Sequence, residues 1–255
     1  MITSPDNEKL KLIRKLRQRK HRDREGLFVT EGEDLARTGI AAGIRPRALL
    51  IHPDLEETDL GEVGETVEPD LLDRASGLGS GSRVIGIWPQ AKPADIPQDG
   101  ICIYLDGLSD PGNMGTIIRT VDALLEATVV VAPGSVDHYA PGSVRASMGS
   151  IFTQPVVRAR IERTPQPRIA TVPRDGERPG PHAAPVTVVL GAEREGLSPE
   201  MVNLCESRWT VPLRQSGAEP GAESLNVAAA AAIVCERISS PGSPGSPAAS
   251  GTESG

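Results

Sequence analysis

Aromatic residues are scarce in this chain, which has two Trp, two Tyr and two Phe among 255 residues. With 38% hydrophobic residues the composition is still that of a globular protein, so its core has to be built from Leu, Ile, Val and Ala. Cysteine is also rare, and Cys102, Cys205 and Cys235 show neither a disulfide framework nor a metal-binding spacing. The four histidines are dispersed as well. We therefore expect no metal site.

Long hydrophobic runs are missing too. No apolar segment approaches the ~18–20 residues that cross a bilayer, and residues 1–20 are charged instead of resembling a signal peptide. The sequence also lacks the Gly-x-Ser-x-Gly pattern of a serine-hydrolase nucleophile. These absences favour a reduced, cytoplasmic protein with no membrane partner.

Charge is present but unevenly distributed. The net charge is −7, yet residues 1–24 hold nine Lys/Arg against three Asp/Glu, which is +6 and leaves −13 for the remainder. A basic N-terminal arm on an acidic protein indicates a face for a polyanion such as a nucleic acid. Leu10, Ile13 and Leu16 give the same arm an apolar stripe, so an ordinary solvated helix remains the alternative. If the arm binds RNA, deleting residues 1–24 should weaken that binding and spare any cofactor site.

Composition divides the chain into two α/β units. Residues 1–90 contain the basic arm, a short β-like run, a helix near 32–42 and further short elements. Residues 91–100 are rich in proline and polar residues and are predicted to be a linker. Residues 101–238 form the second unit. The tail 239–255 has no apolar residue larger than alanine and is predicted to be disordered.

The second unit alternates β-branched runs with helical segments. This pattern is typical of an α/β domain whose mostly parallel sheet is covered on both faces. We expect strands at Ile101–Leu105, Thr128–Ala132, Ile169–Val172, Val186–Leu190 and Trp209–Leu213, and helices at Met114–Glu126, Pro199–Glu206 and Asn226–Arg237.

Three segments of this unit carry polar residues at strand ends or helix starts. In DPGNMGTIIRT, Asn113 follows a strand and Arg119 lies off the apolar stripe of the next helix, so Arg119 should point away from the core. In LGAEREGLSPE, two glycines flank Glu193 and would let backbone approach a ligand closely. Taken singly, each segment also fits an ordinary solvated arginine or a plain strand–turn–helix connection.

The third segment, ESLNVAAAAAIVCERI, joins a polar Ser-Leu-Asn tip to five consecutive alanines. Asn226 or Ser224 suits a helix N-cap, and a helix N-terminus also holds polar or anionic groups. The helix is apolar nearly all round, which predicts that it is buried and that small side chains allow close packing. Leu at Ala229 or Ala230 should then overpack the structure.

In this order the three segments resemble the motifs of the SpoU (TrmH) family of RNA ribose 2′-O-methyltransferases in the SPOUT superfamily. The resemblance covers residues 101–238 and includes RASMGSIFTQPV, between the first and second motifs. The N-terminal unit is similar to the L30e-like substrate-binding domain of many members. Two departures are a long loop at Arg214–Ala222 and the proline-rich stretch Thr164–Pro185.

The resemblance implies an α/β fold: a trefoil-knotted SPOUT methyltransferase domain preceded by an L30e-like domain. It also implies S-adenosylmethionine as cofactor and a homodimer that shares its active sites. The catalytic residues carried over are Arg119, Asn113, Glu193, Ser224 and Asn226. The cofactor-binding positions carried over are Leu190, Gly191, Gly196, Val211, Leu213, Ser224, Leu225 and Asn226.

The implied reaction is transfer of a methyl group to a ribose hydroxyl, which requires RNA and excludes DNA. Ribosomal RNA, for maturation or antibiotic resistance, is favoured over transfer RNA because the separate N-terminal unit is rarer in family members that act on transfer RNA. A transfer RNA enzyme, a non-catalytic RNA-binding protein and a base methyltransferase stay open as alternatives. For Arg119, the role of a cation that clamps phosphate is favoured over that of a base because an arginine guanidinium keeps its positive charge in proteins.

Overall fold

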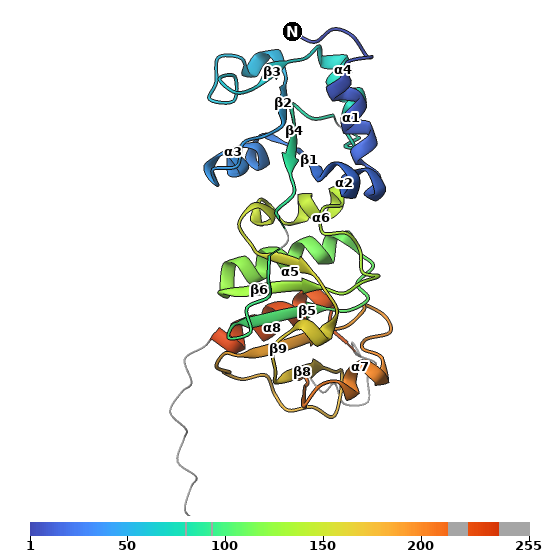
Figure 1. The fold of residues 1–255 in the computed structure, drawn as a ribbon, viewed down its shortest axis with the longest axis vertical. Helices are drawn as coiled ribbons and strands as arrows, with labels where there is room; N and C mark the ends of the chain where they lie inside the picture. Colours follow the sequence, from blue (N-terminus) through green and yellow to red (C-terminus); the bar gives the residue numbers. More distant parts are fainter. Residues whose placement is uncertain (80, 93, 214–223, 240–255) are drawn as a thin grey trace, which may run out of the picture.

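The computed structural model describes residues 1–255 except 80, 93, 214–223 and 240–255. The long loop predicted before Ser224 and nearly all of the predicted disordered tail therefore lie outside the described residues. Ser239, which we had assigned to that tail, instead ends the last helix. The described chain forms two α/β units stacked along the long axis of the molecule, and β4, the last strand of the first unit, ends at Pro89 (Figure 1).

The first unit is built on a four-stranded sheet of order β1-β4-β2-β3. Its strands pair antiparallel except for β2 and β3, which are parallel. The bounds are α1 Glu8–Leu16, α2 Arg19–Glu25, β1 Leu27–Glu31, α3 Glu33–Ala41, β2 Ala48–Ile51, a 3-10 turn at Pro53–Leu55, β3 Glu65–Thr66, α4 Pro69–Ala75 and β4 Val84–Pro89.

The basic arm is helices α1 and α2, and it is part of the first unit's core. The apolar stripe of α1 (Leu10, Ile13 and Leu16) is buried, as the spacing predicted. Some of the cations are engaged within the chain: Lys9 pairs with Glu65, and Arg17 Nη2 donates to the Ala75 carbonyl at 2.7 Å. Deleting residues 1–24 would therefore remove core side chains, so that deletion is a poor test of RNA binding.

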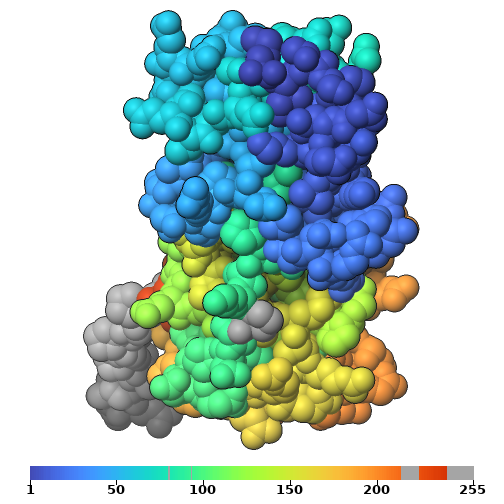
Figure 2. Space-filling model, turned by 45° about the horizontal axis from the view of Figure 1, so that its top comes forward, coloured from blue at the N-terminus to red at the C-terminus, as the bar shows by residue number. Residues whose placement is uncertain are grey.

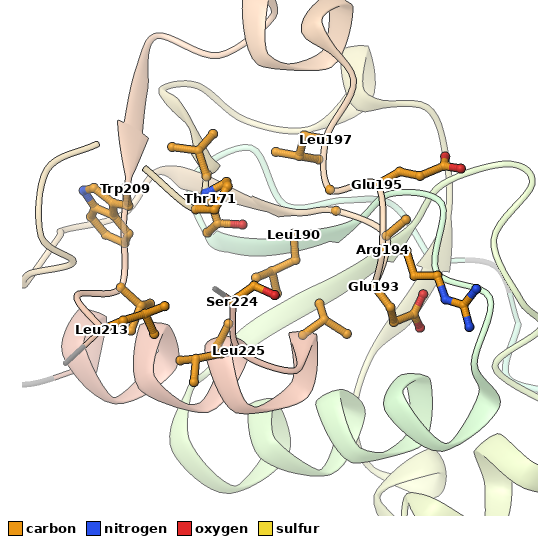
Figure 3. Close-up of a pocket in the computed structure, with 18 residues that line it drawn as sticks. Thr171, Leu190, Glu193, Arg194, Glu195, Leu197, Trp209, Leu213, Ser224 and Leu225 are labelled. Atoms are coloured by element: carbon orange, nitrogen blue, oxygen red, sulfur yellow. The ribbon is translucent and has the colours of Figure 1, made fainter. Parts of the chain in front are cut away.

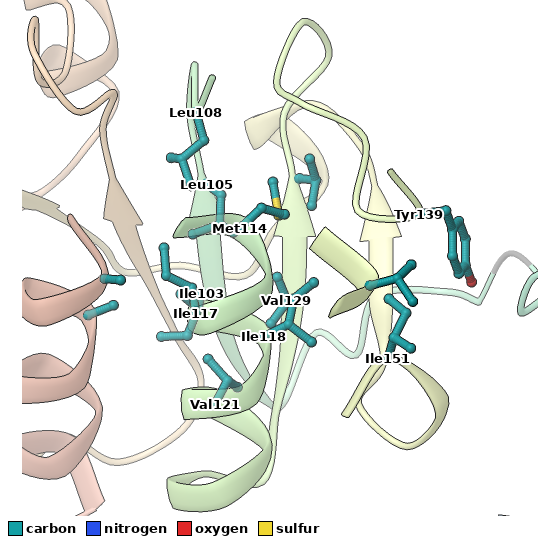
Figure 4. Packing of buried hydrophobic residues seen from close by; sticks show 14 of the residues in the cluster. Ile103, Leu105, Leu108, Met114, Ile117, Ile118, Val121, Val129, Tyr139 and Ile151 are labelled. Atoms are coloured by element: carbon teal, nitrogen blue, oxygen red, sulfur yellow. The ribbon is translucent and has the colours of Figure 1, made fainter. Parts of the chain in front are cut away.

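The second unit contains a fully parallel six-stranded sheet of order β10-β8-β9-β5-β6-β7. Helices α5 and α8 lie side by side over one face of this sheet (Figure 4). The bounds are β5 Ile101–Leu105, α5 Pro111–Leu124, β6 Ala127–Val131, α6 Pro141–Ala146, β7 Val156–Arg158, β8 Arg168–Thr171, β9 Val186–Leu190, α7 Pro199–Asn203, β10 Ser207–Trp209 and α8 Val227–Ser239, with 3-10 turns at Ser150–Phe152 and Ile161–Arg163.

Several elements of the second unit differ from the sequence prediction. The last strand, predicted at Trp209–Leu213, instead ends at Trp209 because the chain leaves the sheet there to line a cavity. Helix α6 and strand β7 were not predicted at all. One residue of the proline-rich stretch also contacts the sheet. Glu177 forms an isolated parallel β-bridge with Trp209, on the side of β10 opposite β8.

The alanine helix α8 is only partly buried, which corrects the prediction made from its apolar surface. Ala228 and Ala231 lie in the core against α5 and the sheet. Ala230 is half-buried and lines the cavity, whereas Ala229 is exposed. The prediction that Leu at Ala229 would overpack the core is therefore wrong for the single chain, and Ala231 is the alanine without room.

The two units share one continuous hydrophobic cluster. Residues of the first unit such as Trp88 belong to the same cluster as Ile117 and Val129 of the second. The space-filling view shows the blue and cyan residues of the first unit resting directly on the green and yellow residues of the second (Figure 2). The predicted linker is also anchored, because Ile96 is buried and the Ala91 N–H donates to the Tyr139 hydroxyl at 2.9 Å.

Candidate functional site

The first motif places Asn113 in the first turn of α5, at the carboxyl edge of the parallel sheet. The Asp110 side chain caps this helix by accepting a hydrogen bond from the Asn113 N–H at 2.7 Å. Pro111 occupies the first helical position, where no N–H is needed. The carboxyl edge of such a sheet is where open α/β folds bind ligands.

The second motif brings Glu193 against this helix start. Its Oε1 accepts hydrogen bonds from Asn113 Nδ2 and the Asp110 N–H, both at 3.1 Å. Its Oε2 accepts from the Ser109 N–H at 3.3 Å and the Ser109 hydroxyl at 3.2 Å. Burial would raise the pKa of Glu193, but these hydrogen bonds outweigh it and hold the pKa below its usual range. Glu193 is therefore an anion that orients its neighbours.

The third motif completes a directional relay of hydrogen bonds. Asn226 Oδ1 accepts from the Ala228 N–H at 2.9 Å at the start of α8, and Asn226 Nδ2 donates to Asn113 Oδ1 at 3.0 Å. Asn113 Nδ2 then donates to Glu193. The N–H at one end can only donate and the carboxylate at the other can only accept, so both amide orientations are fixed. We call Asn113, Glu193 and Asn226 the polar relay.

Arg119 does not join the polar relay within this chain. It lies six residues after Asn113 on α5, which at ~100° per residue is about 120° away around the helix. Its side chain is exposed, as expected, and among the described residues it forms no hydrogen bond or ion pair. Within the described part of a single chain, Arg119 is therefore paired neither with Glu193 nor with any other carboxylate.

A cavity of about 350 Å³ lies beside the relay, between the ends of β8, β9 and β10 and the start of α8 (Figure 3). All of the predicted cofactor-binding positions except Asn226 line it, with Leu190, Leu213 and Leu225 among its apolar walls. Gly191 is required here because a Cβ would lie 2.4 Å from the backbone of Gly196, across a tight turn. The lining also includes residues that the sequence reading missed: Thr171, Val172, Pro173, Ala192, Arg194, Glu195, Leu197, Trp209, Val227 and Ala230.

The cavity fits a nucleoside-sized ligand. Its volume is within the ~300–1,000 Å³ typical of small-molecule sites, and its walls combine apolar side chains with polar backbone of the Gly191–Gly196 turn. Trp209 adds a buried aromatic wall. Thr171 could have been predicted to line the cavity, because it lies at the end of a buried strand. In the described residues, no group of three His, Cys, Asp or Glu could hold a metal ion.

Two family models match the chain. The model described as the SpoU rRNA Methylase family matches residues 100–236. The model described as the MRM3-like substrate binding domain matches residues 7–74. The first match contains the polar relay and the cavity, and the second contains α1 to α3 and all but the last residue of α4.

Curated relatives and solved structures agree with these matches. The chain is 26% identical to the 23S rRNA (guanosine(2553)-2′-O)-methyltransferase RlmP of Bacillus subtilis, over 91% of this chain and 96% of the relative. It is 32% identical to the 23S rRNA (uridine(2479)-2′-O)-methyltransferase of Streptomyces viridochromogenes, over 56% and 54%. An rRNA methyltransferase structure from Sinorhizobium meliloti superposes with a TM-score of 0.77 at 28% identity, covering 92% and 95%. The AdoMet complex of the SpoU methyltransferase AviRb from Streptomyces viridochromogenes gives 0.75 at 27%, covering 90% and 96%.

Proposed function

The chain belongs to the SpoU rRNA methylase family, and we propose that it transfers the methyl group of S-adenosylmethionine to a ribose 2′-hydroxyl of 23S ribosomal RNA. Residues 101–238 are the catalytic domain in this proposal, and residues 1–90 bind the RNA. The family implies the trefoil knot expected for the catalytic domain. Among the described residues, no helix is long and apolar enough to cross a membrane. We propose the cytoplasm as its location.

The observation that carries this proposal is the meeting of the polar relay and the cavity. Segments 80 and 113 residues apart in sequence place Asn113 against Glu193 and Asn226 at one edge of the sheet. The donor bound in the cavity would supply an electrophilic methyl group. In-line transfer requires the accepting hydroxyl oxygen within ~3–3.5 Å of that carbon. The relay is a prebuilt set of dipoles next to the place where that hydroxyl must lie.

The cofactor-binding residues follow from their places in the cavity. Apolar walls at Leu190, Val211 and Leu213 suit an adenine ring, and the turn from Gly191 to Gly196 presents backbone to a ribose. Ser224 and Leu225, at the start of α8, suit the methionine portion of the ligand. S-adenosylmethionine should change the fluorescence of Trp209, and Trp209→Phe should abolish that change. An unchanged spectrum in the native protein at saturating cofactor would contradict this placement.

We propose that Arg119 acts in the active site of a second copy of the chain. Its exposed position on α5, away from Asn113, supports this arrangement, and Leu124 and Ile233 on the neighbouring helices are exposed hydrophobics that a homodimer would cover. As a fixed cation, Arg119 would bind the phosphate next to the target ribose and stabilise the developing alkoxide.

A mixing experiment tests the shared site. Arg119→Ala and Glu193→Ala should each be inactive alone. Mixed and reassociated, they should regain activity, because one site of each mixed dimer then has both an intact Glu193 and an intact Arg119. No recovery in a mixture shown to contain mixed dimers would contradict a shared site. Arg160→Ala, at an exposed arginine after β7, serves as the matched active control.

The reaction itself is tested with methyl-labelled S-adenosylmethionine and purified ribosomal RNA. Label is expected in one nucleotide that resists alkaline cleavage on its 3′ side, because a 2′-O-methyl group blocks that cleavage. Label in a base, label in transfer RNA only, or RNA binding without label would each support one of the alternatives instead. The relatives named above modify different nucleotides, guanosine 2553 and uridine 2479, so the position has to be mapped for this chain.

A further inference from the structure

The junction between the two units holds most of the molecule's aromatic residues. Four of the six lie there: Phe28, Trp88, Tyr139 and Phe152. The Phe28 ring centroid is 4.7 Å from that of Tyr139, and the Trp88 centroid is 4.9 Å from that of Phe152. Gly39 packs under these rings, where a Cβ would lie 2.7 Å from Trp88. A junction packed this closely does not act as a free hinge.

A buried ion pair crosses the same junction. Arg22 of α2 is 3% exposed, and its Nε and Nη2 donate to Asp137 Oδ2 at 2.9 and 2.6 Å. Its Nη1 donates to the carbonyls of Leu16 and Arg17 at 2.8 and 2.9 Å. Burial would raise the pKa of Asp137, but the hydrogen bonds from Arg22 and from the Tyr139 N–H hold it below its usual range. Because Arg22 is buried, it cannot contact RNA itself.

Asp137 connects this pair to the active-site helix. Its carbonyl accepts a hydrogen bond from the Ser143 hydroxyl of α6 at 2.9 Å. Helix α6 in turn lies backbone-to-backbone against α5, since a Cβ at Gly115 would be 2.2 Å from the Ser143 carbonyl oxygen. Asn113 of the polar relay lies two residues before Gly115. Arg22 is therefore linked through consecutive contacts to α5, the helix that carries Asn113 of the polar relay (Figure 4 shows the core side of this helix).

We infer that Arg22 is a positioning residue, which locks the RNA-binding unit in one orientation relative to Asn113 and so selects the ribose that reaches the active site. This inference rests on the proposed function. A buried arginine–carboxylate pair suits the role because its fixed fork geometry admits few alternative packings. RNA held by the first unit then meets the relay at a set distance, and a misplacement of about 1 Å can cost about a hundredfold in rate.

The test compares intact 23S ribosomal RNA with the same RNA cut into short oligonucleotides, which cannot span both units. The variant is Arg22→Gln/Asp137→Asn, which leaves no lone buried charge. We expect kcat/KM to fall at least about tenfold on intact RNA, with the label spreading to neighbouring nucleotides. Activity on oligonucleotides and S-adenosylmethionine affinity should stay within about twofold of native, by the same positioning argument. Arg22→Lys, which keeps the charge but loses the fork, should lie between native and the double variant.

Arg163→Gln/Asp95→Asn is the matched control, because it removes an exposed ion pair between the predicted linker and the second unit and should behave as native. Equal activity losses on intact RNA and on oligonucleotides would overturn the inference, as would no loss on either. If native protein methylates neither substrate, the proposed function fails. Small-angle X-ray scattering then tests by itself whether the Arg22–Asp137 pair fixes the orientation of the two units. A double-variant profile broader than native supports the lock, and an identical profile overturns it.

Discussion

The domain junction and the polar relay each surround a carboxylate with hydrogen-bond donors, but in different settings. At the junction, Asp137 is 7% exposed and is paired with a full positive charge on Arg22. In the relay, Glu193 is only half-buried, and its donors are one side-chain amide, one hydroxyl and two backbone N–H groups. The first arrangement is buried and its two charges are paired, which suits a lock. The second leaves the carboxylate's neighbours accessible to a ligand, which suits a site.

The largest expected effect comes from breaking the buried pair. Arg22→Ala leaves Asp137 buried without its partner and should lower the free energy of unfolding by about 3–5 kcal/mol. Glu193→Gln should change it by no more than about 0.5 kcal/mol, because the side chain is partly solvated. Chemical denaturation of both variants measures the contrast. Similar losses in the two would show that the regions do not differ as described.

Acid should weaken the junction more than the relay. Burial lowers the pKa of His138 to about 4 from 6.5, with Asp137, Arg158, Arg19 and Asp23 as the charged groups that act on it. The unfolded chain therefore takes up this proton first as pH falls. The contribution of neutral His138 is complete above pH 6.5 and is lost by about pH 4, a difference of about 3 kcal/mol.

His138→Phe isolates this effect, because it keeps a ring against Tyr139 and cannot titrate. The free energy of unfolding of the native protein should fall more steeply than that of the variant between pH 6.5 and 4. Parallel pH curves would mean that His138 does not couple the junction to pH.

In the relay, removing one donor should affect rate rather than stability. Asn226→Asp keeps the oxygen that caps α8 but loses the N–H that reaches Asn113. We expect turnover to fall about a hundredfold, as when one preorganised donor is removed from an active site. Asn203→Asp, at an exposed position in α7, is the matched control. Native turnover in Asn226→Asp would remove the relay from the mechanism.

The smallest expected effect distinguishes the two faces of α8. Ala231→Leu should cost about 1–3 kcal/mol by overpacking, since Ala231 is fully buried. Ala229→Leu should cost less than about 0.5 kcal/mol in a single chain. Denaturation at two protein concentrations checks both variants. A loss at Ala229 that depends on concentration would place Ala229 in the interface of the proposed homodimer, whereas a concentration-independent loss would contradict its exposure.

Local patterns predicted most elements of the second unit. The buried β-branched runs predicted β5 and β9 with their observed bounds, and the predicted helix Pro199–Glu206 begins at the observed first residue of α7. The prediction placed β10 too far along the chain. Residues 210–213 follow a β-like run in the sequence, but they pair with no strand in the structure. Strand pairing depends on tertiary contacts, so β-propensity alone does not give the bounds of a strand near the edge of a sheet.

The role of the basic arm also depended on tertiary contacts. Its charge suggested a single polyanion-binding surface, but Arg17 and Arg22 are used to hold the first unit together and to fasten it to the second. No local signal separates a buried arginine from a solvated one, because the difference is a carboxylate 115 residues away. The amphipathic stripe of α1, by contrast, was correct because it depends only on helical spacing.

The sequence by itself indicated the family of this protein, since three short motifs resemble those of the SpoU family in order and spacing, and that resemblance implied the cofactor and the proposed site residues. Those features are local in the chain and can be read without knowing what lies beside them. Only the tertiary structure decided that Asn113, Glu193 and Asn226 form one directional relay and that Arg119 stands apart from it. It also decided that four scarce aromatics and a buried ion pair join the two units. The reason is physical: hydrogen bonding and burial depend on neighbours in space, and folding brings these together from positions far apart in the chain.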